Sequence, residues 1–179
     1  FSNLTTPVAF VRSSADNTDR YWANAGRLFK TSGTNPEAGW GEDAIADSPT
    51  APLYDLIDFK GALICPTSTN LSRLASGAWI ASWWQGTLAQ AALTANPHRF
   101  FILAAALCFT DGFLVHSYDG TVVGTDLTLP QGFRGEGGLV LGEIAFIFGA
   151  QIGGGEAYVY TWDRTATNYI SRFPVGDTE

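Results

Sequence analysis

The chain has 179 residues, of which 46% are hydrophobic and only 15% are charged, and this composition excludes an intrinsically disordered protein. The formal net charge is −7, so we expect no binding to nucleic acid, because phosphate groups require clustered cations. The length is that of one domain, and we expect 1–179 to form a single domain. Because the sequence begins at Phe1 and contains no methionine, we expect this domain to be excised from a longer chain.

The first third of the sequence predicts short strands and one long loop. Apolar runs bounded by turn residues predict strands at Val8–Arg12, Arg27–Lys30 and Leu56–Ile64. Between them, residues 32–52 contain several prolines, glycines and acids and predict a long loop. Trp40 lies in this loop between two glycines. Small neighbours leave an aromatic ring prominent, so Trp40 is a candidate contact for a receptor or ligand, and burial of a folded-back loop is the alternative.

Two elements are expected in the stretch that follows. The run Ala78–Trp84 predicts a strand, and the alanine-rich run Thr87–Thr94 predicts the one short helix of the chain. The pair Asn96-Pro97 would end that helix, because the residue before a proline disfavours helical backbone angles.

The region Leu74–His98 contains no charged side chain, and it holds three of the six tryptophans: Trp79, Trp83 and Trp84. Depletion of charge together with aromatic enrichment is typical of the centre of protein interfaces. We therefore take these tryptophans as candidates for self-association as a homodimer or homotrimer. The alternative is that the region is ordinary central core. Its many polar side chains disfavour a membrane span, and we expect no membrane insertion.

The middle of the sequence predicts a hairpin meander. A long apolar run, Arg99–Phe109, precedes Asp111-Gly112, and a second run precedes Asp119-Gly120. Asp-Gly between apolar runs is a strong hairpin signal, because a type I′ turn requires positive φ at both central residues. The pattern predicts a three-stranded antiparallel meander over 99–127.

Three further strands are expected towards the C-terminus, at Leu139–Phe148, Glu156–Trp162 and Tyr169–Phe173, with glycine-rich turns between them. Many short strands joined by such turns are typical of an all-β protein. The predicted fold is an antiparallel β-sandwich or small β-barrel with one short helix.

No catalytic constellation emerges from the motifs. His116 and Ser117 are adjacent, but neighbouring side chains in a strand point to opposite faces, which disfavours a nucleophile–base pair. Glu143 interrupts an apolar run and is a candidate for a buried or cleft-facing acid. Since its partner cannot be identified from spacing, we expect no catalytic residue and no enzymatic activity.

Neither a metal nor a cofactor is expected. Cys65 and Cys108 are not part of a CxxC motif, and we expect two buried thiols rather than a disulfide. The acidic clusters within 16–19 and 42–47 do not follow EF-hand spacing and are interpreted as solvated loops.

The acidic, lysine-poor composition, the strand-like Gly138–Ala150 (GLVLGEIAFIFGA) and the polar ending Thr161–Glu179 (TWDRTATNYISRFPVGDTE) resemble the protruding domain of small non-enveloped RNA-virus capsid proteins. Such domains are known from noda-, tombus- and Lake Sinai viruses. The resemblance implies a structural domain on the virion surface that associates with copies of itself and contacts a host receptor or glycan. Two alternatives remain open: a secreted carbohydrate-binding or adhesin module, and a small β-fold glycoside hydrolase.

Overall fold

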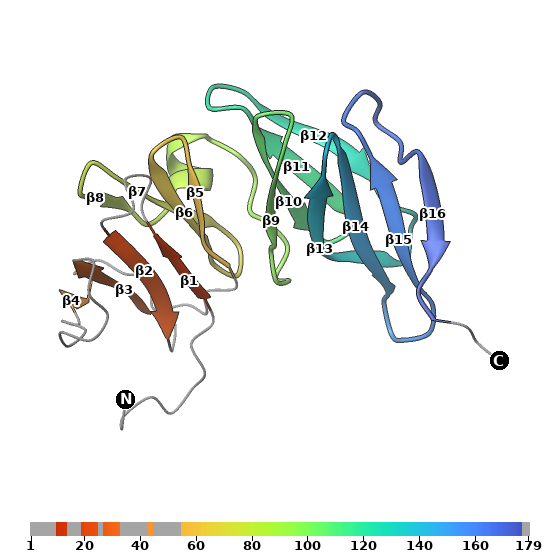
Figure 1. The fold of residues 1–179 in the computed structure, drawn as a ribbon, viewed down its shortest axis with the longest axis horizontal. Coiled ribbons are helices and arrows are strands. Elements are labelled where there is room, and N and C mark those ends of the chain that lie inside the picture. Colours follow the sequence, from red (N-terminus) through yellow and green to blue (C-terminus); the bar gives the residue numbers. More distant parts are fainter. Residues whose placement is uncertain (1–9, 14–18, 25–26, 33–42, 45–54, 177–179) are drawn as a thin grey trace. The chain divides into compact units, whose positions relative to one another are not determined.

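The computed structural model describes residues 10–13, 19–24, 27–32, 43–44 and 55–176 (Figure 1). The fold is all-β, as the sequence predicts, and it contains four four-stranded antiparallel sheets. Each sheet is a meander, because its four strands follow one another along the chain. The chain divides into two compact units, Phe1–Ala95 and Asn96–Glu179, which are described separately.

Unit 1 contains two of the sheets. The strands of the first are β1 (Phe10–Ser13), β2 (Asp19–Asn24), β3 (Arg27–Ser32) and β4 (Asp43–Ala44). The strands of the second are β5 (Ile57–Phe59), β6 (Ala62–Pro66), β7 (Leu71–Ala75) and β8 (Ala78–Ile80). A core of buried side chains includes Leu28 from β3, Cys65 from β6 and Leu74 from β7. The structure divides the predicted strand Leu56–Ile64 into β5 and the start of β6. Lys60 and Gly61 form the turn between them, and the φ angles of both residues are positive.

The segment after β8 differs from its prediction. Ala78–Trp84 is not one strand and Thr87–Thr94 is not a helix. A single π-helical turn, η1 (Trp83–Thr87), overlaps the end of the first range and the start of the second. The reason is that polar side chains of β7 and of the residue before it, Asn70, bind this segment. Ser72 Oγ donates to the Ala81 carbonyl at 2.7 Å, and the Asn70 amide donates to Gln85 Oε1 at 2.8 Å. These tertiary bonds outweigh the local preference for helix or strand.

Unit 2 contains the other two sheets, and Figure 1 shows β13 beside β9 and β10. The strands of the third are β9 (Phe100–Leu103), β10 (Ala106–Asp111), β11 (Leu114–Tyr118) and β12 (Val123–Thr128). The strands of the fourth are β13 (Phe133–Leu141), β14 (Ile144–Gln151), β15 (Ala157–Trp162) and β16 (Ser171–Pro174). The two sheets share one core: Phe101, Leu103, Cys108, Val115, Leu127, Leu129, Ala145, Ile147, Tyr160 and Trp162.

Glycines in β13 allow the two sheets of unit 2 to approach closely. A Cβ built on Gly135 would lie 2.7 Å from Thr110 Cγ2 of β10, and one on Gly138 would lie 2.9 Å from the Phe101 ring of β9. Real Cβ atoms do not come this close, so the packing of β13 on the third sheet requires residues without side chains at these positions.

The predicted meander over 99–127 is present, but it contains four strands rather than three. The apolar run Arg99–Phe109 is broken by a two-residue turn at Ala104 and Ala105, whose φ angles are +49° and +60°. Both positive angles identify a type I′ turn. Alanine is not a turn signal, so the sequence pattern does not reveal this hairpin.

Both Asp-Gly pairs lie at turns, with a geometry that differs from the prediction. The first turn is centred on Gly112 and Phe113, and only Gly112 has positive φ, as in a type II′ turn. The second is a four-residue connection between Tyr118 and Val123, in which Asp119 Oδ1 accepts hydrogen bonds from two backbone amides. Among the residues that the structure describes, no helix is long and apolar enough to cross a membrane.

Candidate functional site

The tryptophans that we proposed for self-association lie in or against the core of unit 1. Trp83 and Trp84 are each 2% exposed, and the Trp84 indole donates a hydrogen bond to the Ala91 carbonyl. Trp79 is half-buried and packs against the core cluster of unit 1. The burial of these side chains fits the alternative that the region is ordinary core, and self-association through them stays a prediction. Trp40, the candidate receptor contact, lies outside the described residues.

The two histidines form a buried network with Asp111. His98 Nδ1 lies 2.9 Å from the Thr110 carbonyl oxygen, and His116 Nε2 lies 3.3 Å from Asp111 Oδ2. The other nitrogen of His116 lies 3.0 Å from the Thr125 hydroxyl. His98 is fully buried, and His116 and Asp111 are 9% and 5% exposed. The network ties β10, β11 and β12 together, and its position in the core indicates a structural role.

Three other sequence candidates have plain structural positions. Glu143 is exposed in the two-residue turn between β13 and β14, so it is neither a buried acid nor a cleft acid. Cys65 and Cys108 are free and buried, as expected for two thiols. Burial raises the pKa of the Cys108 thiol to about 12, and the positive charge of Arg164 opposes this shift. Both thiols are thereby kept protonated and unreactive near neutral pH, since burial also raises the pKa of Cys65.

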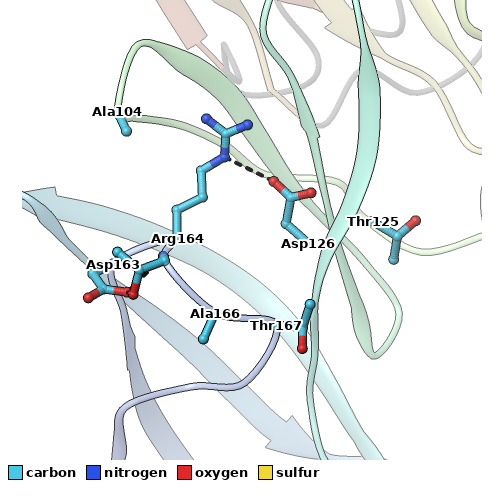
Figure 2. A pocket seen from close by; sticks show the side chains of 8 residues that line it. Ala104, Thr125, Asp126, Asp163, Arg164, Ala166 and Thr167 are labelled. Atoms are coloured by element: carbon cyan, nitrogen blue, oxygen red, sulfur yellow. Dashed lines mark hydrogen bonds and ion pairs between the residues drawn. The ribbon is translucent and has the colours of Figure 1, made fainter.

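Within the part of the chain that the structure describes, unit 2 contains an open cleft of about 430 Å³, shown in Figure 2, that has the size of a binding site. Its walls come from the β9–β10 turn, from β12 and from the loop between β15 and β16. The lining residues are Ala104, Thr125, Asp126, Asp163, Arg164, Thr165, Ala166 and Thr167. The cleft therefore combines charged groups and hydroxyls with two small alanines.

A β-bulge positions the carboxylate of the cleft. Val115 of β11 pairs with Leu127 and His116 pairs with Thr125, so Asp126 is the extra residue of β12. A bulge re-aims the side chain of its extra residue. The carboxylate of Asp126 turns over Gly124, where an added Cβ would overlap its Oδ1 atom. The absence of a side chain at Gly124 thus leaves the space in which the Asp126 carboxylate lies.

The loop after β15 positions the guanidinium. Asp163 Oδ1 accepts hydrogen bonds from the Thr165 amide at 2.9 Å and the Thr165 hydroxyl at 2.7 Å, and these bonds lower the pKa of Asp163. The indole of the buried Trp162 donates to the Ala166 carbonyl at 2.8 Å. With both ends held, Arg164 adopts a φ of +67°, an uncommon angle for a residue with a side chain.

Asp126 and Arg164 meet in the cleft, as Figure 2 shows. Arg164 Nε donates to Asp126 Oδ2 at 2.9 Å, and Arg164 Nη2 donates to Ser117 Oγ at 3.3 Å. The Ser117 hydroxyl in turn donates to Asp126 Oδ2. Asp126 and Arg164 are each 25% exposed on their side chains, so the pair is fixed by neighbours and still reachable from solvent.

This arrangement leaves hydrogen-bonding capacity for a ligand on both side chains of the pair. Within the described part of the chain, neither Asp126 Oδ1 nor Arg164 Nη1 makes a hydrogen bond. A carboxamide or a peptide group presents both an N–H and a C=O, so it offers a partner to a carboxylate oxygen and a partner to a guanidinium in the same cleft. Ser117 is 2% exposed and is not placed to act as a nucleophile.

Sequence reasoning did not find this site, because its residues come from separate strands and form no motif. The nearest signal was the turn chemistry of 163–168, where Asp163 precedes Thr165 by two residues and predicts a side-chain-capped turn. Across the residues that the structure describes, no cluster of three or more histidine, cysteine or acidic side chains could hold a metal ion.

Comparison with known proteins gives similarity at the level of the fold. Neither a protein-family model nor a curated protein sequence matches the chain. The WD40 domain of Neurospora crassa Pan2 is similar over 93% of this chain and 49% of its own, with 13% identity and a TM-score of 0.62. A chain in the S. cerevisiae complex of a Dbp5 variant with Nup159, a Gle1 variant, IP6 and ADP is similar over 94% of this chain and 47% of its own, with 11% identity and a TM-score of 0.60.

A third structure, the extracellular domain of the putative one-component system BT4673 from B. thetaiotaomicron, is 13% identical, with a TM-score of 0.51 over 98% of this chain and 29% of its own. This chain thus spans about half the length of the first two structures. WD40 domains are β-propellers, in which each blade is a four-stranded antiparallel sheet. Each of the four consecutive meanders of this chain therefore has the strand order of a propeller blade, and the likeness to these structures is one of fold.

Proposed function

We propose that the chain is a recognition module without catalytic activity, which binds a peptide segment of a partner protein at the Asp126–Arg164 cleft. The observation that carries this proposal is the fixed Asp126–Arg164 pair, in which Asp126 Oδ1 and Arg164 Nη1 make no hydrogen bond within the described residues. A bulge and a turn with an uncommon φ hold the pair in place before any ligand arrives, and such preorganisation lowers the entropic cost of binding. The ligand group that fits is an amide, either an Asn or Gln side chain or an exposed backbone peptide.

The charges of the cleft favour a neutral ligand group over an ion. Asp126 and Asp163 carry two negative charges against the one positive charge of Arg164, so a carboxylate or phosphate would meet net repulsion. The volume of about 430 Å³ suits a side chain with its flanking backbone. The similar S. cerevisiae structure is itself an assembly of several proteins, which agrees with a role in protein recognition.

The test is selection of peptides from a displayed random library on the immobilised chain. We expect the selected peptides to contain an Asn or Gln whose change to Asp or Glu weakens binding at least about tenfold, since a carboxylate would face Asp126. Arg164→Lys should weaken binding to a similar extent, because lysine lacks the planar fork that reaches Asp126, Ser117 and the ligand together.

Arg172→Lys is the matched control, because Arg172 stacks over the Tyr158 ring rather than lining the cleft. Binding that survives Arg164→Lys, or that responds equally to both substitutions, would remove the cleft as the site. Selected peptides without any preference for amide over acid would remove the proposed ligand group.

The role as a capsid protrusion that contacts a host receptor or glycan stays a prediction, as do the adhesin and hydrolase alternatives. The fold similarity adds no support to any of them. A glycan array with the same two arginine variants would separate a carbohydrate ligand from a peptide.

A further inference from the structure

One end of the buried histidine network is an exposed hydroxyl group. Thr125 of β12 is exposed, and its Oγ1 atom lies 3.0 Å from Nδ1 of His116. The other ring nitrogen of His116, Nε2, lies 3.3 Å from Oδ2 of the buried Asp111. A chain of hydrogen bonds therefore runs from an exposed hydroxyl through an imidazole to a buried carboxylate. We call Thr125, His116 and Asp111 the Thr125 triad.

The hydroxyl of the triad is separate from the Asp126–Arg164 pair, although Thr125 borders the same cleft. His116 and Ser117 are neighbours in β11, so their side chains point to opposite faces of the third sheet. The Thr125 hydroxyl contacts His116, whereas the Asp126 carboxylate contacts Ser117. Figure 2 accordingly shows the Thr125 and Asp126 side chains on opposite sides of β12.

The contacts of His116 determine where its ring carries a proton. An ionised carboxylate only accepts hydrogen bonds, so Nε2 carries the hydrogen that faces Asp111, and Nδ1 of the neutral ring is an acceptor. The Thr125 hydroxyl then donates to Nδ1. A nucleophilic hydroxyl requires this arrangement, in which a base lies within hydrogen-bond reach and a third group holds the base in the correct tautomer. From this geometry we propose that Thr125 is an activated nucleophile that accepts an acyl group from an activated ester.

The surroundings of His116 suit a base that gains a proton during the reaction. His116 is 9% exposed and Asp111 is 5% exposed, so the positive charge that forms on the ring lies beside a carboxylate and largely out of water. The Phe109 ring packs against the imidazole, with the two ring centroids 5.3 Å apart, and limits its rotation. Because Thr125 is exposed, an ester can reach its oxygen while the base stays sheltered.

The reaction is a single acyl transfer. Thr125 Oγ1 forms a bond to the carbonyl carbon of the ester, and the hydroxyl proton moves to His116 Nδ1. The bond between that carbon and the leaving oxygen then breaks, and the leaving oxygen takes the proton from His116. The chain gains one acyl group, an alcohol is released, and His116 returns to its neutral form. One transfer modifies the chain without turnover, so this proposal neither contradicts the recognition module nor rests on it.

The experiment treats the 179-residue chain with p-nitrophenyl acetate, an ester with a good leaving group, and follows acetylation by peptide mapping in a mass spectrometer. Thr128 is the internal control, because it is exposed in the same strand and no hydrogen bond joins its hydroxyl to a histidine within the described residues. General-base catalysis contributes about 10²–10⁴-fold to a rate, so acetylation of Thr125 should be at least about a hundredfold faster than that of Thr128. Equal rates at the two threonines would overturn the proposal.

Two variants test the role of the base. His116→Gln cannot take up the proton and should slow acetylation of Thr125 at least about a hundredfold, whereas Thr128→Val should leave that rate unchanged. Circular dichroism checks that both variants are folded, and the comparison of Thr125 with Thr128 in the parent chain decides the question if His116→Gln does not fold. Undiminished acetylation of Thr125 in a folded His116→Gln chain would overturn the proposal. Release of nitrophenolate that continues beyond one equivalent and requires Thr125 would support the nucleophile, and it would overturn only the absence of catalysis in the proposed function.

Discussion

Gly124 is the residue on which the shape of the cleft depends. The φ angle of Gly124 is not positive, so its backbone does not require a glycine. A glycine is needed because the Asp126 carboxylate lies where a side chain would otherwise be. Asp126 holds both Ser117 and Arg164 through one oxygen. A single missing Cβ thus permits the contact between β11, β12 and the loop after β15.

We predict that Gly124→Ala lowers the free energy of unfolding by about 1–3 kcal/mol, because the carboxylate must move away and its hydrogen-bonded partners lose their acceptor. Urea denaturation measures this change. Gly86→Ala is the control, since its nearest side-chain atom, Ser82 Cβ, is at 3.7 Å, an ordinary contact distance. Equal effects of the two substitutions would show that the loss comes from glycine chemistry in general rather than from the Asp126 contact.

Among the hairpins of the described residues, the one between β9 and β10 has a strained turn backbone. Lys60-Gly61 and Ser76-Gly77 place a glycine at one of two positive-φ positions, whereas Ala104-Ala105 provides no glycine at all. A residue with a side chain loses roughly 1–2 kcal/mol in the left-handed region. The third sheet therefore holds the β9–β10 turn against its local preference, and this turn lines the cleft through Ala104.

The double substitution Ala104→Asn with Ala105→Gly should stabilise the chain by about 1 kcal/mol, because Asn-Gly is the preferred pair for a type I′ turn. Thermal unfolding followed by circular dichroism measures it. As a control, Ala150→Gly lies in β14 and has no positive φ, so it should destabilise by about 0.5–1 kcal/mol. A double variant no more stable than the parent would remove the assignment of strain to this turn.

How much of the fold could be predicted follows from the range of the forces involved. The conformation of the Asp-Gly and glycine-rich turns depends on a few neighbouring residues, so these turns and the strands beside them could be predicted from the sequence. The hairpin at Ala104-Ala105 could not be found, because its conformation is imposed by the sheet on residues that do not prefer it. The turn at Trp83–Thr87 could not be found either, since hydrogen bonds from Asn70 and Ser72 determine it. The cleft was missed for the same reason: Ser117, Asp126 and Arg164 meet only in the folded chain.

For the whole molecule, the distribution of the core decides which parts can fold alone. The ten buried residues of the unit 2 cluster all lie between Phe101 and Trp162, and every strand pair of the third and fourth sheets lies within unit 2. Two packed four-stranded sheets meet the usual requirement for independent stability, whereas a single small sheet with an uncovered face does not.

We therefore predict that residues 96–179 fold without the rest of the chain. Trp162 is the only tryptophan in that range and is fully buried, so its fluorescence reports on this unit alone. The fragment should show blue-shifted emission and one cooperative urea transition, because burial removes the indole from water and the shared core links both sheets. Residues 96–130, which contain only the third sheet, serve as the comparison and should show no cooperative transition by circular dichroism. If residues 96–179 gave the red-shifted emission of an exposed indole without urea, the core described here would be insufficient, and the two units would have to fold together.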